Sequence, residues 1–203
     1  MTTARKRSRI DTEQRFLDAV LALLAESGFT RLGVNSVAEC AAADKVLIYR
    51  YFGDFDGLLE RVAESRSWLP SAEEILSGAG HRPADQLKHI FRRIAQYIKR
   101  DDAARQVALW RAAAQNPLTV KYGEEWKKLW KELAEAFSRG VPHQERQKWL
   151  RALEILSAMT HSNISGEPVQ ESWIDFLCTN LEPHALRENI SMEQADILPT
   201  NLL

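Results

Sequence analysis

The stretch DKVLIYRYFGD, residues 44–54, combines two cationic side chains with two tyrosine hydroxyls. Cations of this kind pair with phosphate oxygens or reach base edges in a major groove, and hydroxyls can donate to phosphates. Residue propensity alone predicts a β-strand here, because β-branched and aromatic residues favour strands. Whether these side chains lie on one face therefore depends on whether the backbone is a strand or a helix.

A helical backbone gives the stretch two distinct faces. Ile48 and Phe52 lie four residues apart and would face a core, which turns Lys45, Val46, Tyr49 and Arg50 outward. Asp44 is placed to cap such a helix, and tertiary packing can override the strand propensity of so short a segment. We therefore predict a helix over 45–52 with a charged outer face.

Short helices are expected on both sides of this segment. Apolar residues in 11–27 follow a helical stripe, and Asp11 with Gln14 resembles a capping box at its start. A second helix is expected over about 33–40, followed by a tight turn at 41–44. Asp54 is a candidate N-cap for the next helix. Three short helices with such a turn have the proportions of a helix-turn-helix.

Cations also cluster at the N-terminus, where Arg5, Lys6, Arg7 and Arg9 all precede the first acidic residue. Such an arm could follow phosphates or enter a minor groove. A disordered tail that only aids solubility explains the same composition equally well.

The remainder of the chain is also predicted to be helical, so the fold class is all-α. Residues 70–83 contain Gly78, Gly80 and two prolines and are expected to form a loop. Beyond them, helices are predicted from residue 83, over 103–114, from Pro117, and over two further segments that end near 161 and 181. We predict two domains, with residues 1–68 forming the helix-turn-helix domain and its connecting helix, and 69–203 a larger helical domain.

The last two predicted helices are apolar on more than one side. A stripe that broad exceeds what one core contact requires, so a homodimer interface is predicted there. A deeply internal pair of helices is the alternative. The interface candidates are Trp149, Leu153, Leu156, Trp173, Leu177 and Leu181.

Aromatic residues concentrate in the second domain, since all six tryptophans lie at or after position 68. Ligand pockets are usually lined by apolar and aromatic side chains, although most such residues simply form core. The candidates for binding a small apolar or aromatic ligand are Phe91, Tyr97, Trp110, Trp126, Trp130 and His161.

Other chemistries find little support in the sequence. The five histidines show no metal-ligand spacing, and neither a phosphate-binding glycine loop nor a nucleophile elbow is present, so no metal, cofactor or enzymatic activity is expected. Cys40 and Cys178 stand far apart in apolar surroundings and are interpreted as two packed, reduced thiols, which suggests a cytoplasmic protein. No membrane-spanning run and no signal peptide is recognised.

Residues 10–60 resemble the DNA-binding domain of the TetR (tetracycline repressor) family. The resemblance lies in an ordered pattern rather than in one motif: Ala19, Leu23, Gly28-Phe29, Val37-Ala38, Ala41, Ile48-Tyr49, Tyr51-Phe52 and Leu58-Leu59. Beyond the loop the similarity is one of architecture. The resemblance implies a regulator that binds a near-palindromic DNA operator as a homodimer through its last two helices and holds a small ligand in some pocket.

Carried over by position, the resemblance assigns DNA contacts to two helices. Asn35 falls where the family often contacts DNA from its second helix. The recognition helix would supply Lys45, Val46, Leu47, Tyr49, Arg50 and Tyr51. For the two tyrosines, packing with a solvated hydroxyl is the alternative, and Tyr49 is the better candidate for a DNA contact.

Four positions depart from the family pattern. Ala42 occupies a turn position where glycine is common, and a left-handed residue with a Cβ costs roughly 1 kcal/mol. Gly33 replaces a hydroxyl at the start of the second helix, Leu47 replaces a small or hydroxylated residue, and Phe55 replaces a lysine that would hold a phosphate. Each lost charge contact weakens DNA binding and flattens its salt dependence.

The protein is predicted to be a ligand-responsive transcriptional regulator, and it is expected to repress transcription. The rival prediction is a ligand-binding or interaction protein on the same scaffold that has lost DNA binding.

Overall fold

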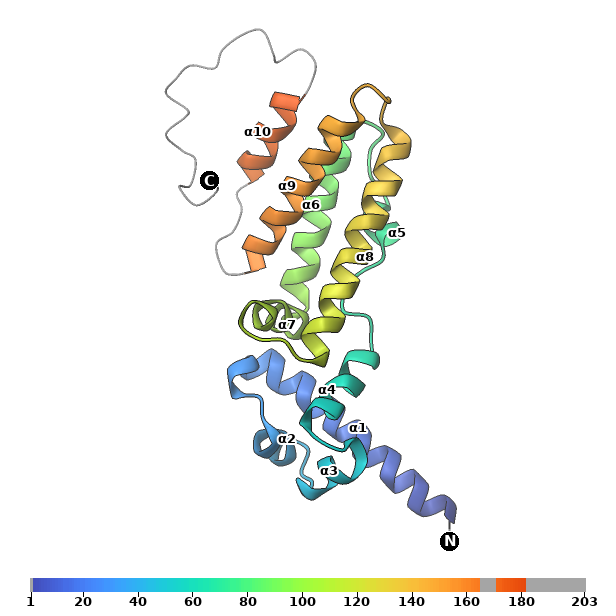
Figure 1. The fold of residues 1–203 in the computed structure, drawn as a ribbon, viewed down its shortest axis with the longest axis vertical. Helices are drawn as coiled ribbons and strands as arrows, with labels where there is room; N and C mark the ends of the chain where they lie inside the picture. The colour runs from blue at the N-terminus through green and yellow to red at the C-terminus, as the bar shows by residue number, and fades with distance from the viewer. Residues whose placement is uncertain (1, 165–170, 182–203) are drawn as a thin grey trace.

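The computed structural model describes residues 2–164 and 171–181, and within these ranges the chain is helical and contains no strand. This confirms the all-α prediction. Figure 1 shows the elements in chain order. The N-terminal elements are α1 (Thr2–Ser27), η1 (Phe29–Arg31), α2 (Val34–Cys40), α3 (Val46–Phe52) and α4 (Phe55–Glu64). The C-terminal elements are α5 (Ala72–Leu76), α6 (Pro83–Arg100), α7 (Asp102–Ala113), α8 (Pro117–Gly140), α9 (Arg146–Ile164) and α10 (Glu171–Leu181).

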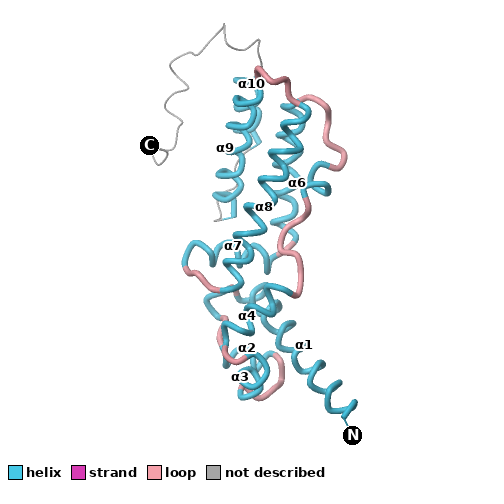
Figure 2. The backbone as a smooth tube through the Cα atoms, turned by 45° about the vertical axis from the view of Figure 1, so that its right-hand side comes forward, coloured by secondary structure: helices cyan, strands magenta, loops and turns pink. Residues whose placement is uncertain are grey.

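Helix α1 is longer than the sequence predicted. It begins at Thr2, so the expected capping box at Asp11 was wrong, and Asp11 lies exposed inside the helix. The helical turn before it is continuous, since the Thr12 hydroxyl donates to the Ser8 carbonyl at 2.8 Å. The physical reason is that residues 2–10 contain neither glycine nor proline and are rich in good helix formers. Figure 2 shows this N-terminal part of α1 projecting beyond the other helices.

The N-terminal helices share one small core. Helix α1 buries Phe16, Val20 and Leu24 completely, and Ile48 of α3 is equally buried. Asp54 caps α4 as predicted, because its side chain accepts from the Gly57 amide at 2.7 Å. These contacts hold α2 and α3 beneath α1 and α4, as Figure 1 shows.

The segment that the sequence predicted to be a loop contains the short helix α5. Ser71 and Glu74 form a capping box: the Glu74 amide donates to the Ser71 hydroxyl at 3.1 Å, and the Ser71 amide donates to the Glu74 carboxylate at 2.8 Å. Ile75 is buried against the larger domain. The Ser-x-x-Glu pattern in the sequence is typical of a capping box at a helix start. The neighbouring glycines and prolines favoured a loop instead.

Helices α6, α8, α9 and α10 lie alongside one another, with α7 across the end nearest the N-terminal helices (Figures 1 and 2). Side chains cap two of these helices: Asp101 accepts from the Ala104 amide at 2.9 Å at the start of α7, and Asn116 accepts from the Thr119 amide at 3.0 Å at the start of α8. No described helix is long and apolar enough to cross a membrane.

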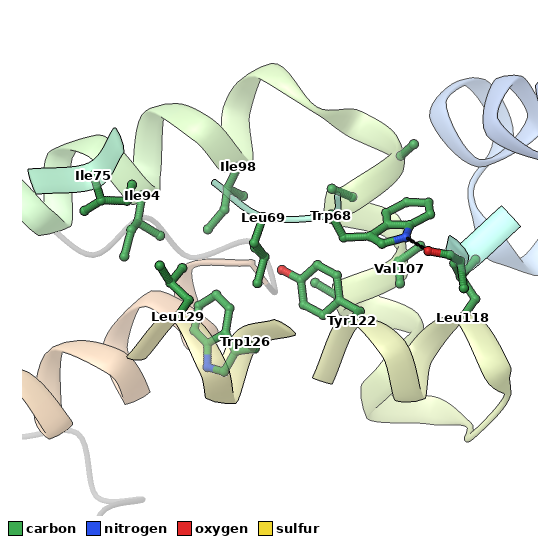
Figure 3. Packing of buried hydrophobic residues seen from close by; sticks show 14 of the residues in the cluster. Trp68, Leu69, Ile75, Ile94, Ile98, Val107, Leu118, Tyr122, Trp126 and Leu129 are labelled. Atoms are coloured by element: carbon green, nitrogen blue, oxygen red, sulfur yellow. Dashed lines mark hydrogen bonds between the residues drawn. The ribbon is translucent and has the colours of Figure 1, made fainter. Parts of the chain in front are cut away.

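An aromatic stack and a hydrogen bond help to join the N-terminal helices to the larger domain. Phe29 stacks on Trp110 of α7, with ring centroids 5.8 Å apart and planes inclined by 12°. Trp68, which is fully buried, donates its backbone amide to Glu125 of α8 at 2.8 Å and its indole N–H to the Ala63 carbonyl at 3.1 Å (Figure 3). The division after residue 68 remains a prediction, because the hydrophobic core is continuous across it.

A partly buried ion pair lies beside this junction. The Arg66 guanidinium, just beyond α4, pairs with the Asp101 carboxylate at the α6–α7 corner and also lies 5.0 Å from the centre of the Trp68 ring. Asp101 therefore has two functions, since its other carboxylate oxygen caps α7. The end of α4 is thereby tied to the start of α7.

These two functions of Asp101 can be separated by substitution. Asp101→Asn keeps a good capping oxygen but loses the charge, so we expect it to lower the free energy of unfolding by about 0.5–1 kcal/mol. Asp101→Ala also loses the cap and should cost about 1 kcal/mol more. Urea unfolding followed by circular dichroism measures both. Asp102→Asn, which removes an exposed partner of Arg105, is the control and should change little; equal losses in Asp101→Asn and Asp101→Ala would contradict the assigned cap.

Candidate nucleic-acid interface

The turn between α2 and α3 contains a residue in the left-handed region. Ala42 has φ 48°, which makes it the only residue other than glycine with positive φ in the described chain. The turn is closed by amide donation from Ala43 to the Ala38 carbonyl at 3.0 Å. From α1, the Arg15 guanidinium donates to the Ala42 carbonyl at 3.4 Å. The left-handed conformation expected at Ala42 is therefore present, and a cation on α1, which sequence reasoning overlooked, holds the turn.

Helix α3 has the orientation that its apolar spacing predicted. Ile48 is completely buried, and the Phe52 ring meets the Phe16 ring of α1 edge-on, at 6.1 Å between centroids. On the opposite side, Val46 is 60% and Tyr49 52% exposed, and Arg50 is exposed as well. The strand propensity of the segment is overridden, and its polar groups form an open face.

The beginning of α3 is fixed by side chains from two helices. Asp44 accepts a hydrogen bond from the Val46 amide at 2.9 Å, as predicted for a cap. The Lys45 ammonium group donates to the Asn35 side-chain oxygen of α2 at 3.3 Å. Two residues that were predicted separately to contact DNA are thus brought together across the helix-turn-helix, while both remain exposed. Gly33 precedes α2 and supplies no side-chain cap.

Two other residues assigned to DNA contact are less open. Leu47 and Tyr51 are partly buried and pack against the core, so each presents only part of its side chain outward. The guanidinium of Arg9, from α1, lies 5.0 Å from the centre of the Tyr51 ring and also pairs with Glu13 at 2.6 Å. Phe55 is likewise partly buried against the core, so it does not form a separate apolar patch.

The basic N-terminal segment belongs to a helix. Arg5, Lys6 and Arg7 all lie in α1, and their side chains lie outside the described part of the structure. The expectation of a disordered arm was therefore wrong. A helical backbone spaces these cations along a rod and cannot follow a groove as an extended arm does.

The two cysteines differ in their surroundings. Cys178 is buried and its thiol lies 3.7 Å from the Ala84 carbonyl, as expected for a packed thiol. Cys40 is exposed at the end of α2, so the prediction that it is packed was wrong. Among the described residues, no group of three or more histidine, cysteine or acidic side chains could hold a metal ion.

The described aromatic residues that were predicted to line a ligand pocket lie at several places in the larger domain. Trp110 stacks on Phe29 at the junction, and Phe91 is buried between α6 and its neighbours. Trp126 contacts Tyr122 on one side and Trp130 on the other, with centroids 6.3 and 5.8 Å away (Figure 3 shows Trp126 and Tyr122). Burial raises the pKa of the Tyr97 hydroxyl, as expected for a phenol in the domain interior. The side chain of His161 lies outside the described part.

The predicted dimer contacts on α9 lie inside the protomer. Trp149, Leu153 and Leu156 are each at most 3% exposed, because they pack against α6 and α8. Their place in the core corrects the expectation that they form the outer face. Among the side chains described on the last two helices, the large apolar ones that are exposed are Ile155 and Phe176, at 47% and 48%. The side chains of Trp173, Leu177 and Leu181 lie outside the described part.

Helices α1 to α3 and the open face of α3 define a helix-turn-helix domain. Residues 16–62 match the family described as "Bacterial regulatory proteins, tetR family". This match confirms the resemblance for the N-terminal helix-turn-helix domain, where it covers residues 16–62.

Solved structures share the fold over most of the chain. A TetR-family transcriptional regulator from Rhodococcus sp. is 19% identical, with a TM-score of 0.53 over 84% of this chain and 96% of its own. A TetR-like regulator from Rhodococcus sp. RHA1 is 18% identical, with a TM-score of 0.52 over 84% and 92%. An HlyIIR variant with an engineered linker is 16% identical, with a TM-score of 0.52 over 82% and 94%. No curated protein sequence matches the chain.

The left-handed turn residue generates a stability prediction. A left-handed conformation costs a residue with a Cβ about 1–2 kcal/mol, and Ala42→Gly removes this cost. Because glycine also raises the backbone entropy of the unfolded chain, the free energy of unfolding should rise by only about 0.5–1 kcal/mol. The free energy of unfolding in urea measures the change. Ala41→Gly is the matched control, because Ala41 has φ −74° and is buried, and glycine there should destabilise by about 1 kcal/mol. Destabilisation by both substitutions would contradict strain at Ala42.

Proposed function

We propose that the protein is a ligand-responsive transcriptional repressor that binds a near-palindromic DNA operator as a homodimer. The observation that carries the proposal is the orientation of α3: Ile48 is fully buried, and Tyr49 and Arg50 are exposed beside Val46. A helix with one buried apolar side and a polar outer face is what a major groove accepts.

Each exposed group on this face has a DNA partner of matching chemistry. Arg50 and Lys45 pair with phosphates or with guanine acceptors, and the Tyr49 hydroxyl donates to a phosphate. Val46 is the apolar side chain that protrudes furthest, so it supports contact with a thymine methyl group better than the partly buried Leu47. Asn35 holds the Lys45 ammonium group from α2 and borders the same face.

The site has few fixed charges for phosphates. Phe55 packs against the core at a position where a cation was expected, and the Arg9 guanidinium is already engaged by Glu13 and Tyr51. Binding energy then depends more on base-edge and hydroxyl contacts than on counterion release. We therefore propose a salt dependence shallower than that of a strongly basic helix-turn-helix.

Selection of binding sites from random duplex DNA at two salt concentrations tests the proposal. We expect a dyad-symmetric sequence whose affinity falls with salt, and Tyr49→Ala with Arg50→Ala should lower that affinity at least tenfold, roughly the loss of one or two polar contacts. The matched control is Arg61→Ala, an exposed α4 cation paired with Glu64. No enrichment above the double variant would favour the rival, a ligand-binding protein that has lost DNA binding.

The proposed dimer interface lies on α9 and α10. Ile155 and Phe176 expose large apolar side chains on these two helices, next to the buried residues that form the core side. Exposed apolar groups on adjoining helices support contact with a second copy, since burying them on association is favourable. Trp173, Leu177 and Leu181 remain candidates for the same interface.

Charged substitutions test this interface. Ile155→Asp together with Phe176→Asp should convert the dimer to a monomer in sedimentation velocity, because two carboxylates would be buried without partners. Val120→Asp is matched in exposure, at 48%, but lies on α8, and it should leave the dimer intact. A dimer that persists in the double variant, with unchanged circular dichroism, would place the interface elsewhere.

Ligand response is proposed as a population shift between inter-domain arrangements. The contacts available to transmit it are the Phe29–Trp110 stack, the Trp68–Glu125 hydrogen bond and the Arg66–Asp101 ion pair. All three join the helix-turn-helix end of the molecule to α7, α8 or the corner before α7. A ligand that moves these helices would thereby change the spacing of the two recognition helices in a dimer.

A further inference from the structure

A groove of about 410 Å³ lies between the end of α7 and the first turns of α8. Its border carries both charged and apolar side chains. The residues that the argument uses are Arg111, Gln115, Val120, Gly123, Glu124 and Lys127. It is separate from the aromatic core and from the open face of α3.

Gly123 gives Arg111 its place in this groove. A Cβ built on Gly123 would lie 2.8 Å from Arg111 Nε, and the three heavy atoms nearest to that Cβ all belong to Arg111. The absence of a side chain on α8 therefore lets the guanidinium stem lie directly against the helix. Arg111 is half-buried there, which limits its freedom and presents its donors in a fixed direction.

The two cations of the groove are not neutralised by an ion pair. Within the described residues, neither Arg111 nor Lys127 has a side-chain hydrogen bond or a carboxylate within 4.0 Å, although Glu124 also borders the groove. The neighbouring groove between residues 67–71 and α8 differs, because Lys121 and Lys128 face Glu125 and Glu132, both at 3.9 Å. The α7–α8 groove thus retains a net positive charge of one.

The same groove offers an apolar surface beside the cations. Val120 is 48% exposed, and Ala112 is exposed on the opposite side. The Gln115 side chain is also exposed and can donate to an oxygen. A planar guanidinium matches a carboxylate bidentately, and a nearby ammonium group adds a point charge.

We propose that the α7–α8 groove binds a small organic acid, with the carboxylate held by Arg111 and Lys127 and an apolar body packed on Val120. The proposal does not depend on DNA binding. Its position matters, because α7 also carries Trp110, which stacks on Phe29 of the N-terminal unit. An acid bound here contacts the helix that supports the DNA-binding end of the molecule.

Fluorine NMR on the full chain tests the site with 4-fluorophenylacetate as probe and 4-fluorophenylacetamide as its uncharged counterpart. We expect saturable line broadening of the acid and little of the amide. Arg111→Gln and Lys127→Gln should each weaken binding about tenfold, the loss of one charge-assisted contact. Lys128→Gln is the matched control, because it removes the same charge one residue along α8 and should leave binding unchanged.

Gly123→Ala separates geometry from charge. The added methyl group displaces Arg111 without changing the net charge, so binding should weaken by a similar factor while circular dichroism and the melting temperature do not fall. Binding of the acid and the amide with equal affinity, equal loss in Lys128→Gln, or full binding by Arg111→Gln would overturn the proposal. Displacement of the probe by inorganic phosphate at matched ionic strength would also overturn it, since a general anion site needs no apolar body.

Discussion

The burial of Ile48 between α3 and the helices above it is the constraint on which the DNA-binding face depends. Ile48 is completely buried, and one helical turn further on the Phe52 ring meets Phe16 edge-on. These contacts set the rotation of α3 about its own axis. A rotation by one residue would expose Ile48 to water and bury Tyr49 instead, at a cost of roughly 2–3 kcal/mol for the apolar side chain alone. The exposed positions of Val46, Tyr49 and Arg50 follow from that rotation.

The helix-turn-helix is in turn supported from the larger domain. Three contacts of different kinds meet at the junction: the stack of Phe29 on Trp110, the hydrogen bond from Trp68 to Glu125, and the ion pair of Arg66 with Asp101. Because Trp68 is fully buried and its indole is also hydrogen-bonded, the connection after α4 cannot rotate freely. These contacts tie α8 and the start of α7 to the end of α4. The groove that contains Arg111 and Lys127 borders both α7 and α8.

Local signals in the sequence predicted most of the helix boundaries correctly. Asp54, Asp101 and Asn116 cap helices because their short side chains reach amides two or three residues onward, which neighbouring residues alone decide. The long extent of α1 was missed, since a capping signal at Asp11 has no effect when the preceding residues are already helical. The placement of α3 in a helix rather than a strand required the flanking helices and the tight turn before it, because seven residues of strand-favouring composition are ambiguous by themselves.

The sequence by itself determined the all-α class, the helix-turn-helix, and the inward and outward faces of α3, because these depend on spacing along one segment. Only the tertiary structure decided which apolar residues are already covered. Trp149, Leu153 and Leu156 were predicted at a subunit interface and lie in the protomer core, and Trp110 stacks on Phe29, which is far from it in the sequence. Hydrophobicity predicts that a side chain will be buried, but which surface buries it depends on helices brought together from distant parts of the chain. The pairing of Asn35 with Lys45 and the position of Arg111 over Gly123 likewise depend on how two helices pack together.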